Sequence, residues 1–210
     1  MGIDSGYGVG SLKTGVCTST TRPASPFEGQ TVYETDTDLV KSYNGTSWAP
    51  VSGLQYITGA SFSAVTSFSL AANTFSATYE NYFITMIVTT GSLTSLRFRM
   101  RAAGVDNTSS NYRNSYLQDN AFATSTGDTG LIVNSYDTAT SISASMYVHS
   151  PQLSVATQTT ATGTYTRTTT PSSVLAGTTL TVTTSYDSMT FLRDAGTMTG
   201  SYKVYGLANS

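Results

Sequence analysis

The chain has 210 residues, enough for one large domain or for one medium-sized domain with a small appendage. Only 10% of the residues are charged, against about 25% in an ordinary soluble domain, and serine and threonine take up the difference. The net charge of -2 and the lack of any lysine or arginine run exclude an electrostatic attraction to nucleic acid, and the single cysteine excludes an internal disulfide.

Residue types that form strands dominate the composition. Threonine, tyrosine, valine and phenylalanine suit a pleated sheet, whereas the helix formers glutamate, lysine and glutamine are scarce. No window approaches eighteen apolar residues, and the N-terminus lacks the basic-then-apolar order of a signal peptide. We therefore expect an all-β protein with no membrane partner and no cleaved export signal.

Residues 1–17 are rich in glycine and show no hydrophobic period, which predicts an extended N-terminal arm. From Thr18 the sequence TSTTRPASPFEG adds two prolines, and the residue before each proline is driven away from helical geometry. We expect this segment to be extended as well.

A small β-meander is predicted over residues 18–53, which hold the only tryptophan of the chain. Its expected strands are 32–35, 39–43 and 47–51. Between the last two lies Asn44-Gly45, a pair that favours a type I′ hairpin turn. Three short strands bury little surface alone, so Tyr33, Tyr43 and Trp48 must pack against one another or against a neighbour. We interpret this module as a docking clip.

Residues 54–210 show short alternating strands separated by turn residues, a pattern typical of an antiparallel, jelly-roll-like β-sandwich. Over 142–148 apolar residues alternate with serines and a tyrosine, which predicts one buried face. Tyr82 to Val88 is apolar on both faces, which suits either a central strand covered on both sides or an oligomer interface. The biased segment 154–170 predicts a long exposed hairpin.

Residues able to carry chemistry are few. His149, the only histidine, has no nucleophile or carboxylate near it in sequence, which favours a surface histidine over a catalytic one. Glu34, Asp36 and Asp38 alternate but lack the length and the glycine of a calcium loop, so we favour a turn stabilised by aspartates over a calcium site. No carboxylate pair suggests glycoside hydrolysis. We expect no enzyme, no metal and no cofactor.

Three of the ten basic residues alternate along one predicted strand, in the sequence SLRFRMRAAG, and share one of its faces. One interpretation is an exposed strand whose like charges resist edge pairing. The other is a basic stripe that contacts an acidic partner or an anionic glycan. The candidate interface residues are Tyr33, Tyr43, Trp48, Arg97, Arg99 and Arg101.

Two stretches resemble parts of tailed-bacteriophage virion proteins. Residues 18–51, with their Arg-Pro, Gly-Gln, Tyr-Glu-Thr-Asp-Thr, Tyr-Asn-Gly and Trp landmarks, look like a short module found near the N-termini of such proteins. The closing sequence MTFLRDAGTMTGSYKVYGLANS is similar to the end of their jelly-roll-like domains, and YENYFITMIVTTG followed by LRFRMRAAG is similar to their paired core strands.

The resemblance implies a structural component of the tail-fibre, head-fibre or capsid-decorating kind, often trimeric and without catalytic residues. Because no coiled-coil or repetitive shaft is evident, we favour a compact decoration over a fibre. We expect a capsid cement protein, made in the host cytoplasm, that docks on the major capsid protein at the virion exterior as a homotrimer. The alternative is a tail receptor-binding protein that recognises a host-surface glycan.

Overall fold

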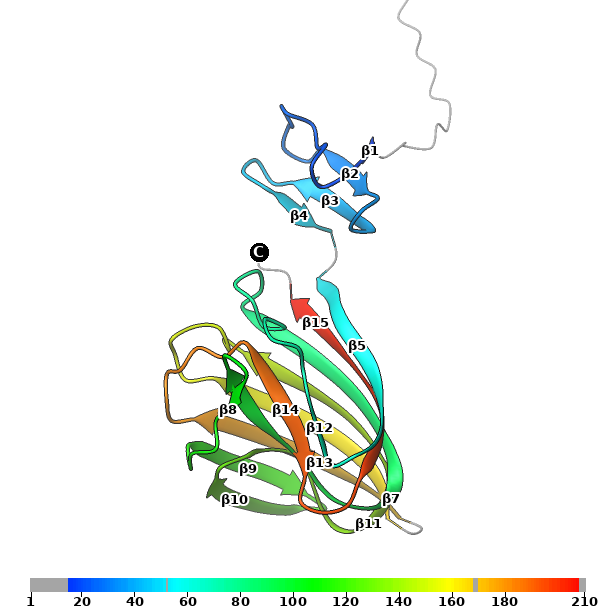
Figure 1. The fold of residues 1–210 in the computed structure, drawn as a ribbon, viewed down its shortest axis with the longest axis vertical. Coiled ribbons are helices and arrows are strands. Elements are labelled where there is room, and N and C mark those ends of the chain that lie inside the picture. The colour runs from blue at the N-terminus through cyan, green and yellow to red at the C-terminus, as the bar shows by residue number, and fades with distance from the viewer. Residues whose placement is uncertain (1–14, 52, 168–169, 208–210) are drawn as a thin grey trace, which may run out of the picture. The chain divides into compact units, whose positions relative to one another are not determined.

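The computed structural model describes residues 15–51, 53–167 and 170–207, and the chain divides into two units, 1–53 and 54–210 (Figure 1). The described residues form fifteen strands and no helix, which confirms the all-β prediction. Within that part of the chain there is accordingly no helix that could cross a membrane.

The first unit is a four-stranded sheet in the order β1-β2-β3-β4. Its strands are β1 (Gly15–Cys17), β2 (Thr31–Glu34), β3 (Leu39–Tyr43) and β4 (Trp48–Pro50). The three predicted strands are confirmed to within two residues at their ends. Strand β1 pairs in parallel with β2, so the last residues of the predicted arm belong to the sheet; residues 1–14 lie outside the described residues.

The loop between β3 and β4 differs from the predicted type I′ turn. It contains four residues, 44–47, and only Gly45 has a positive φ, of 90°. The side-chain oxygen of Asn44 accepts hydrogen bonds from the backbone N–H groups of Thr46 (3.0 Å) and Ser47 (2.8 Å). Because its side chain stabilises this wider loop, Asn44 does not adopt the positive φ that a type I′ turn would require.

The second unit contains an eleven-stranded sheet in which every pairing is antiparallel. The strands are β5 (Leu54–Val65), β6 (Ser67–Ser69), β7 (Asn81–Ala102), β8 (Val105–Asp106), β9 (Tyr112–Gln118), β10 (Ala121–Gly127), β11 (Gly130–His149), β12 (Gln158–Arg167), β13 (Thr170–Leu180), β14 (Ser188–Arg193) and β15 (Met198–Leu207). The main path runs β10-β9-β13-β12-β11-β7-β14-β6, and β15 joins β5 to β7.

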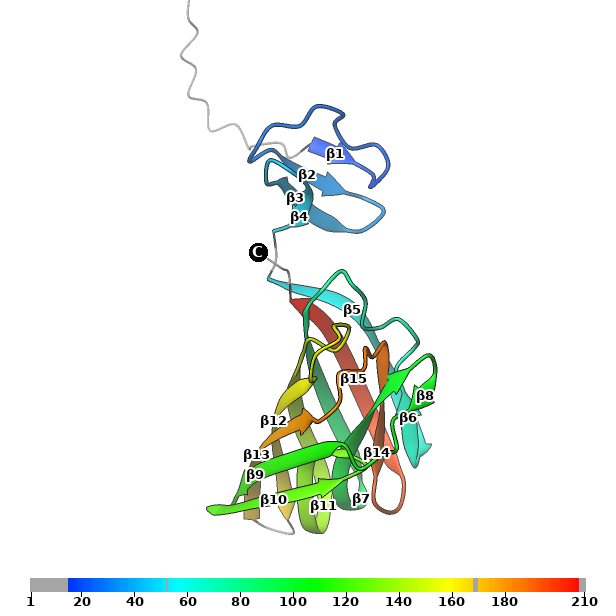
Figure 2. The same cartoon turned by 90° about the vertical axis from the view of Figure 1, so that its left-hand side faces the viewer.

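Two long strands, β7 and β11, pass from one layer of the second unit to the other (Figures 1 and 2). The first half of β7 pairs with β15, and its second half pairs with β14. The layers meet through stacked rings: Phe68 of β6 lies 4.3 Å from Phe62 of β5 and 5.1 Å from Tyr202 of β15, between ring centroids. The sandwich is therefore one continuous hydrogen-bonded sheet that folds back on itself.

Alternation along the strands separates the core from the surface. In β7 the side chains of Tyr82, Ile84 and Val88 are buried, whereas Ile87 on the other face is 55% exposed. This apolar strand is therefore central but covered on one face only within a single chain. The segment 154–170, predicted as a long exposed hairpin, instead supplies the single strand β12 and the first residue of β13. Because β12 lies between β11 and β13 in the sheet and buries Tyr165, the exposed placement is wrong.

Candidate functional site

A buried carboxylate fastens the segment before β2 onto the small sheet. Glu34 is 0% exposed, is ion-paired with Arg22 and accepts a hydrogen bond from the Thr37 hydroxyl (2.9 Å). The bond from Arg22 holds the pKa of Glu34 below its ordinary value, although burial acts in the opposite direction. Asp36 accepts bonds from the hydroxyl (2.6 Å) and the N–H (2.8 Å) of Ser19, and the hydroxyl bond above all lowers its pKa.

These contacts change two interpretations of the sequence. The segment 18–28 turns back and bonds to the sheet instead of extending away from it. Each carboxylate of the alternating series has a partner within the unit, since Asp38 accepts a bond from the Tyr33 hydroxyl. The partners favour the stabilised turn, and in the described part of the chain no three His, Cys, Asp or Glu side chains are placed to hold a metal ion.

The three aromatic residues predicted as an interface are divided between two faces of the small sheet. Tyr43 and Trp48 are cross-strand partners with ring centroids 5.5 Å apart, and both are half-buried. Tyr33 lies on the opposite face, because it alternates with buried Val32 and Glu34 along β2. Tyr43 and Trp48 therefore stabilise the unit as a pair, and Tyr33 belongs to a different surface.

That other surface is a row of apolar side chains, which we call the docking row: Val16, Tyr33, Val40 and Val51. The register aligns the first three across β1, β2 and β3, and Val51, which directly follows β4, donates its N–H to the Val40 carbonyl (3.1 Å). The valines at 16, 40 and 51 are 70%, 44% and 63% exposed. Single exposed valines are common on proteins, whereas an aligned row of them is a candidate contact surface. Sequence reasoning identified only its tyrosine.

The arginine ladder lies in the second half of β7, which pairs with β14 on one side and, on the other, with β11 as far as Phe98 and with β8 from Arg101. The strand is not an edge, so the interpretation as protection against edge pairing is wrong. Every arginine of the ladder is ion-paired with an aspartate from another segment. The pairs are Arg97–Asp194 (2.8 Å), Arg101–Asp106 (2.9 Å) and Arg99–Asp128. This pairing leaves the ladder little charge with which to attract an acidic partner.

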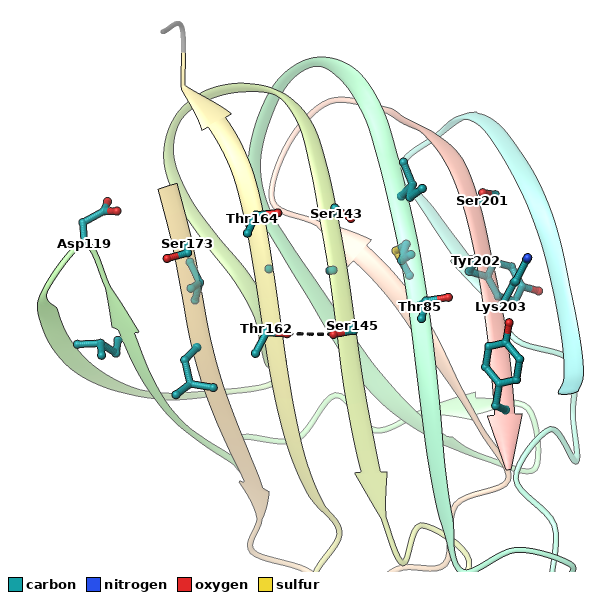
Figure 3. A pocket seen from close by; sticks show the side chains of 18 of the residues that line it. Thr85, Asp119, Ser143, Ser145, Thr162, Thr164, Ser173, Ser201, Tyr202 and Lys203 are labelled. Carbon is teal, nitrogen blue, oxygen red and sulfur yellow. Dashed lines mark hydrogen bonds between the residues drawn. The ribbon is translucent and has the colours of Figure 1, made fainter. Parts of the chain in front are cut away.

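The outer face of the large sheet carries an open groove of about 830 Å³ (Figure 3). Outward side chains from β15, β7, β11, β12 and β13 meet in register to form its floor. One row is Lys203, Thr85, Ser145, Thr162 and Leu175, and the next is Ser201, Ile87, Ser143, Thr164 and Ser173. Hydroxyl groups predominate, and those of Ser145 and Thr162 are hydrogen-bonded to each other at 2.9 Å.

A row of aromatic side chains adjoins the groove through Tyr205, which lines it. Tyr56, Tyr205, Phe83 and Tyr147 are successive cross-strand partners on β5, β15, β7 and β11. Their ring centroids are 5.8, 6.4 and 4.8 Å apart in that order. At the end of the row, His149 stacks on Tyr147 and places Nδ1 3.2 Å from Asn81 Oδ1, contacts that favour its interpretation as a surface histidine.

Comparisons with protein-family models, with curated proteins and with solved structures give no match for this chain. The resemblance to virion proteins therefore rests on the sequence landmarks of residues 18–51 and of the core and closing strands. What the two units do must be argued from their surfaces.

Proposed function

We propose that this chain is a non-enzymatic structural protein of a tailed-phage virion, a capsid cement or decoration protein. Its N-terminal unit docks on the major capsid protein, and residues 54–210 are displayed at the virion exterior. The observation that carries this proposal is the docking row, which aligns three exposed valines and Tyr33 on one face of the compact N-terminal unit.

The docking row has the properties of a small attachment site. Its valines are branched at Cβ and lose little side-chain freedom on binding, and Tyr33 adds a large apolar ring with a polar tip. The area is small, so tight attachment requires several copies acting together, as a homotrimer on a symmetric lattice would provide. The charge-poor exterior of the second unit limits nonspecific adhesion.

Cosedimentation with expanded empty capsids of the phage that encodes the chain tests this function. We expect saturable binding of the full chain and none by residues 54–210. Val40→Lys places a charge in the docking row and should weaken binding strongly, whereas Thr46→Lys, in the exposed β3–β4 loop, should not. Equal binding by the full chain and by residues 54–210 would contradict docking through the N-terminal unit.

The alternative function is a receptor-binding protein of the tail, and the groove on the large sheet favours it. In that case residues 54–210 alone will bind host cells or their surface polysaccharide, and the full chain will not sediment with empty capsids. Saturable capsid binding without cell binding would exclude it.

A further inference from the structure

We propose that the groove on the outer face of the large sheet binds an acidic oligosaccharide. Sugar rings would lie along the aromatic row and the hydroxyl-lined floor, and an anionic group of the ligand would contact Lys203. This ligand is independent of what the N-terminal unit contacts, so either proposal can fail without the other.

The side chains of the floor favour a sugar over a second protein chain. Protein interfaces are depleted in serine and alanine, and their strongest contacts are tryptophan, tyrosine and arginine near the centre. In this groove the aromatic residues lie at the margin (Figure 3). The centre is formed by four side chains that carry hydroxyl groups: Ser143, Ser145, Thr162 and Thr164. A hydroxyl both donates and accepts hydrogen bonds, so a floor of hydroxyls suits a ligand that itself carries many hydroxyls.

The aromatic row supplies the apolar half of such a site. The rings of Tyr56, Tyr205, Phe83 and Tyr147 follow one another over four adjacent strands, and the outer two residues are 54% and 42% exposed. Sugars present faces of C–H groups as well as hydroxyls, and exposed aromatic rings beside hydrogen-bonding groups match both. On the floor, Ile87 and Leu175, 55% and 49% exposed, add apolar contacts among the hydroxyls.

A single cation stands where the hydroxyl floor meets the aromatic row. Lys203 is exposed, and none of the carboxylates that the structure describes lies within ion-pair distance of it. Beside it Gly59 packs closely against β15: a Cβ there would lie 2.7 Å from the Tyr202 carbonyl oxygen and 3.3 Å from Lys203 Cγ. The other charged residue of the groove, Asp119, lies at the far end and accepts a bond from the Ser172 hydroxyl. An anionic group therefore belongs at the Lys203 end.

The test uses the full chain and a panel of immobilised oligosaccharides in matched pairs, each chain containing uronic acid beside its carboxyl-reduced form. We expect binding to acidic members that weakens with added salt. Lys203→Met should weaken that binding about tenfold or more and remove the preference over the reduced forms. Arg113→Met, which changes an exposed cation of β9 that does not line the groove, should leave binding unchanged.

A second variant keeps the test independent of the lysine. Thr164→Trp places a large ring on the groove floor at an exposed strand position that tolerates aromatic residues, so the fold should persist, as circular dichroism will check. Binding to every panel member should be lost. The proposal is overturned if no member binds, or if neither groove variant affects binding. It is also overturned if Thr164→Trp disperses an oligomer of the unmodified chain, which would assign the groove to a second copy.

Discussion

Replacing Glu34 with glutamine should destabilise the N-terminal unit and leave the second unit unaffected. The carboxylate is 0% exposed, is paired with Arg22 and accepts a bond from Thr37. Glutamine keeps the shape but removes the charge, and a hydrogen bond to a charged group contributes about 1.5–3 kcal/mol. The Arg22 side chain is 32% exposed and can be rehydrated, so we expect a loss near the lower limit, about 1.5–2 kcal/mol.

The assay follows from the position of the only tryptophan. Trp48 lies in the N-terminal unit, so its fluorescence reports the unfolding of that unit, while far-ultraviolet circular dichroism is dominated by the large sheet. Small proteins have urea m-values near 1 kcal/mol/M, so the fluorescence midpoint should fall by roughly 1.5–2 M urea. The free energy of unfolding of a small unit is low, so this loss is a large fraction of it and is easily measured.

The matched control is Glu28→Gln, which changes an exposed glutamate of the same unit and should leave the midpoint in place. If the Glu34→Gln midpoint equals that of the unmodified chain, the buried ion pair adds nothing net to stability and the reasoning fails. If the fluorescence and dichroism transitions shift together, the two units do not unfold separately.

Three further outcomes are expected. The ion pair with Arg22 holds the pKa of Glu34 below its ordinary value of 4.5. The contribution of this pair to the stability of the N-terminal unit should therefore be constant above pH 4.5 and be lost as the pH falls through the lowered pKa. Acid titration followed by tryptophan fluorescence checks this. Gly200→Ala would place a Cβ 2.0 Å from a backbone oxygen of β7 and should destabilise the second unit by about 1–3 kcal/mol. Gly127→Ala is the control, because a Cβ there has no atom within 4 Å, and it should leave the stability unchanged. Thermal unfolding distinguishes the two variants. Arg97→Ala should cost less than about 1 kcal/mol in the same assay, because Asp194 in the pair is 45% exposed.

Local sequence patterns predict much of the fold. In a half-buried strand, apolar and polar residues alternate, and this pattern predicts the strands of the small unit near their observed positions. It also places Ile142 to Val148 correctly in a strand, but β11 begins much earlier, at Gly130. The Asn44-Gly45 turn type was not, because the choice between a two-residue and a four-residue loop depends on which residues pair on the flanking strands.

The groove and the ion pairs of the arginine ladder both depend on strand register and long-range pairing, which no local sequence pattern contains. The groove exists because Thr85, Ser145 and Thr162 align across β7, β11 and β12, although each belongs to an ordinary alternating strand. The arginine ladder was visible in the sequence, but its aspartate partners come from three other segments. Long-range pairing therefore turns an apparent basic stripe into a neutral surface and gathers scattered hydroxyls into one site.

The most direct test of docking by the N-terminal unit is to transfer it. Residues 1–53, fused to a monomeric fluorescent protein, should sediment with expanded capsids in a saturable manner, and a Val40→Lys version of the fusion should not. If the fusion stays in the supernatant while the full chain sediments, attachment resides in residues 54–210 and the account of the N-terminal unit is wrong.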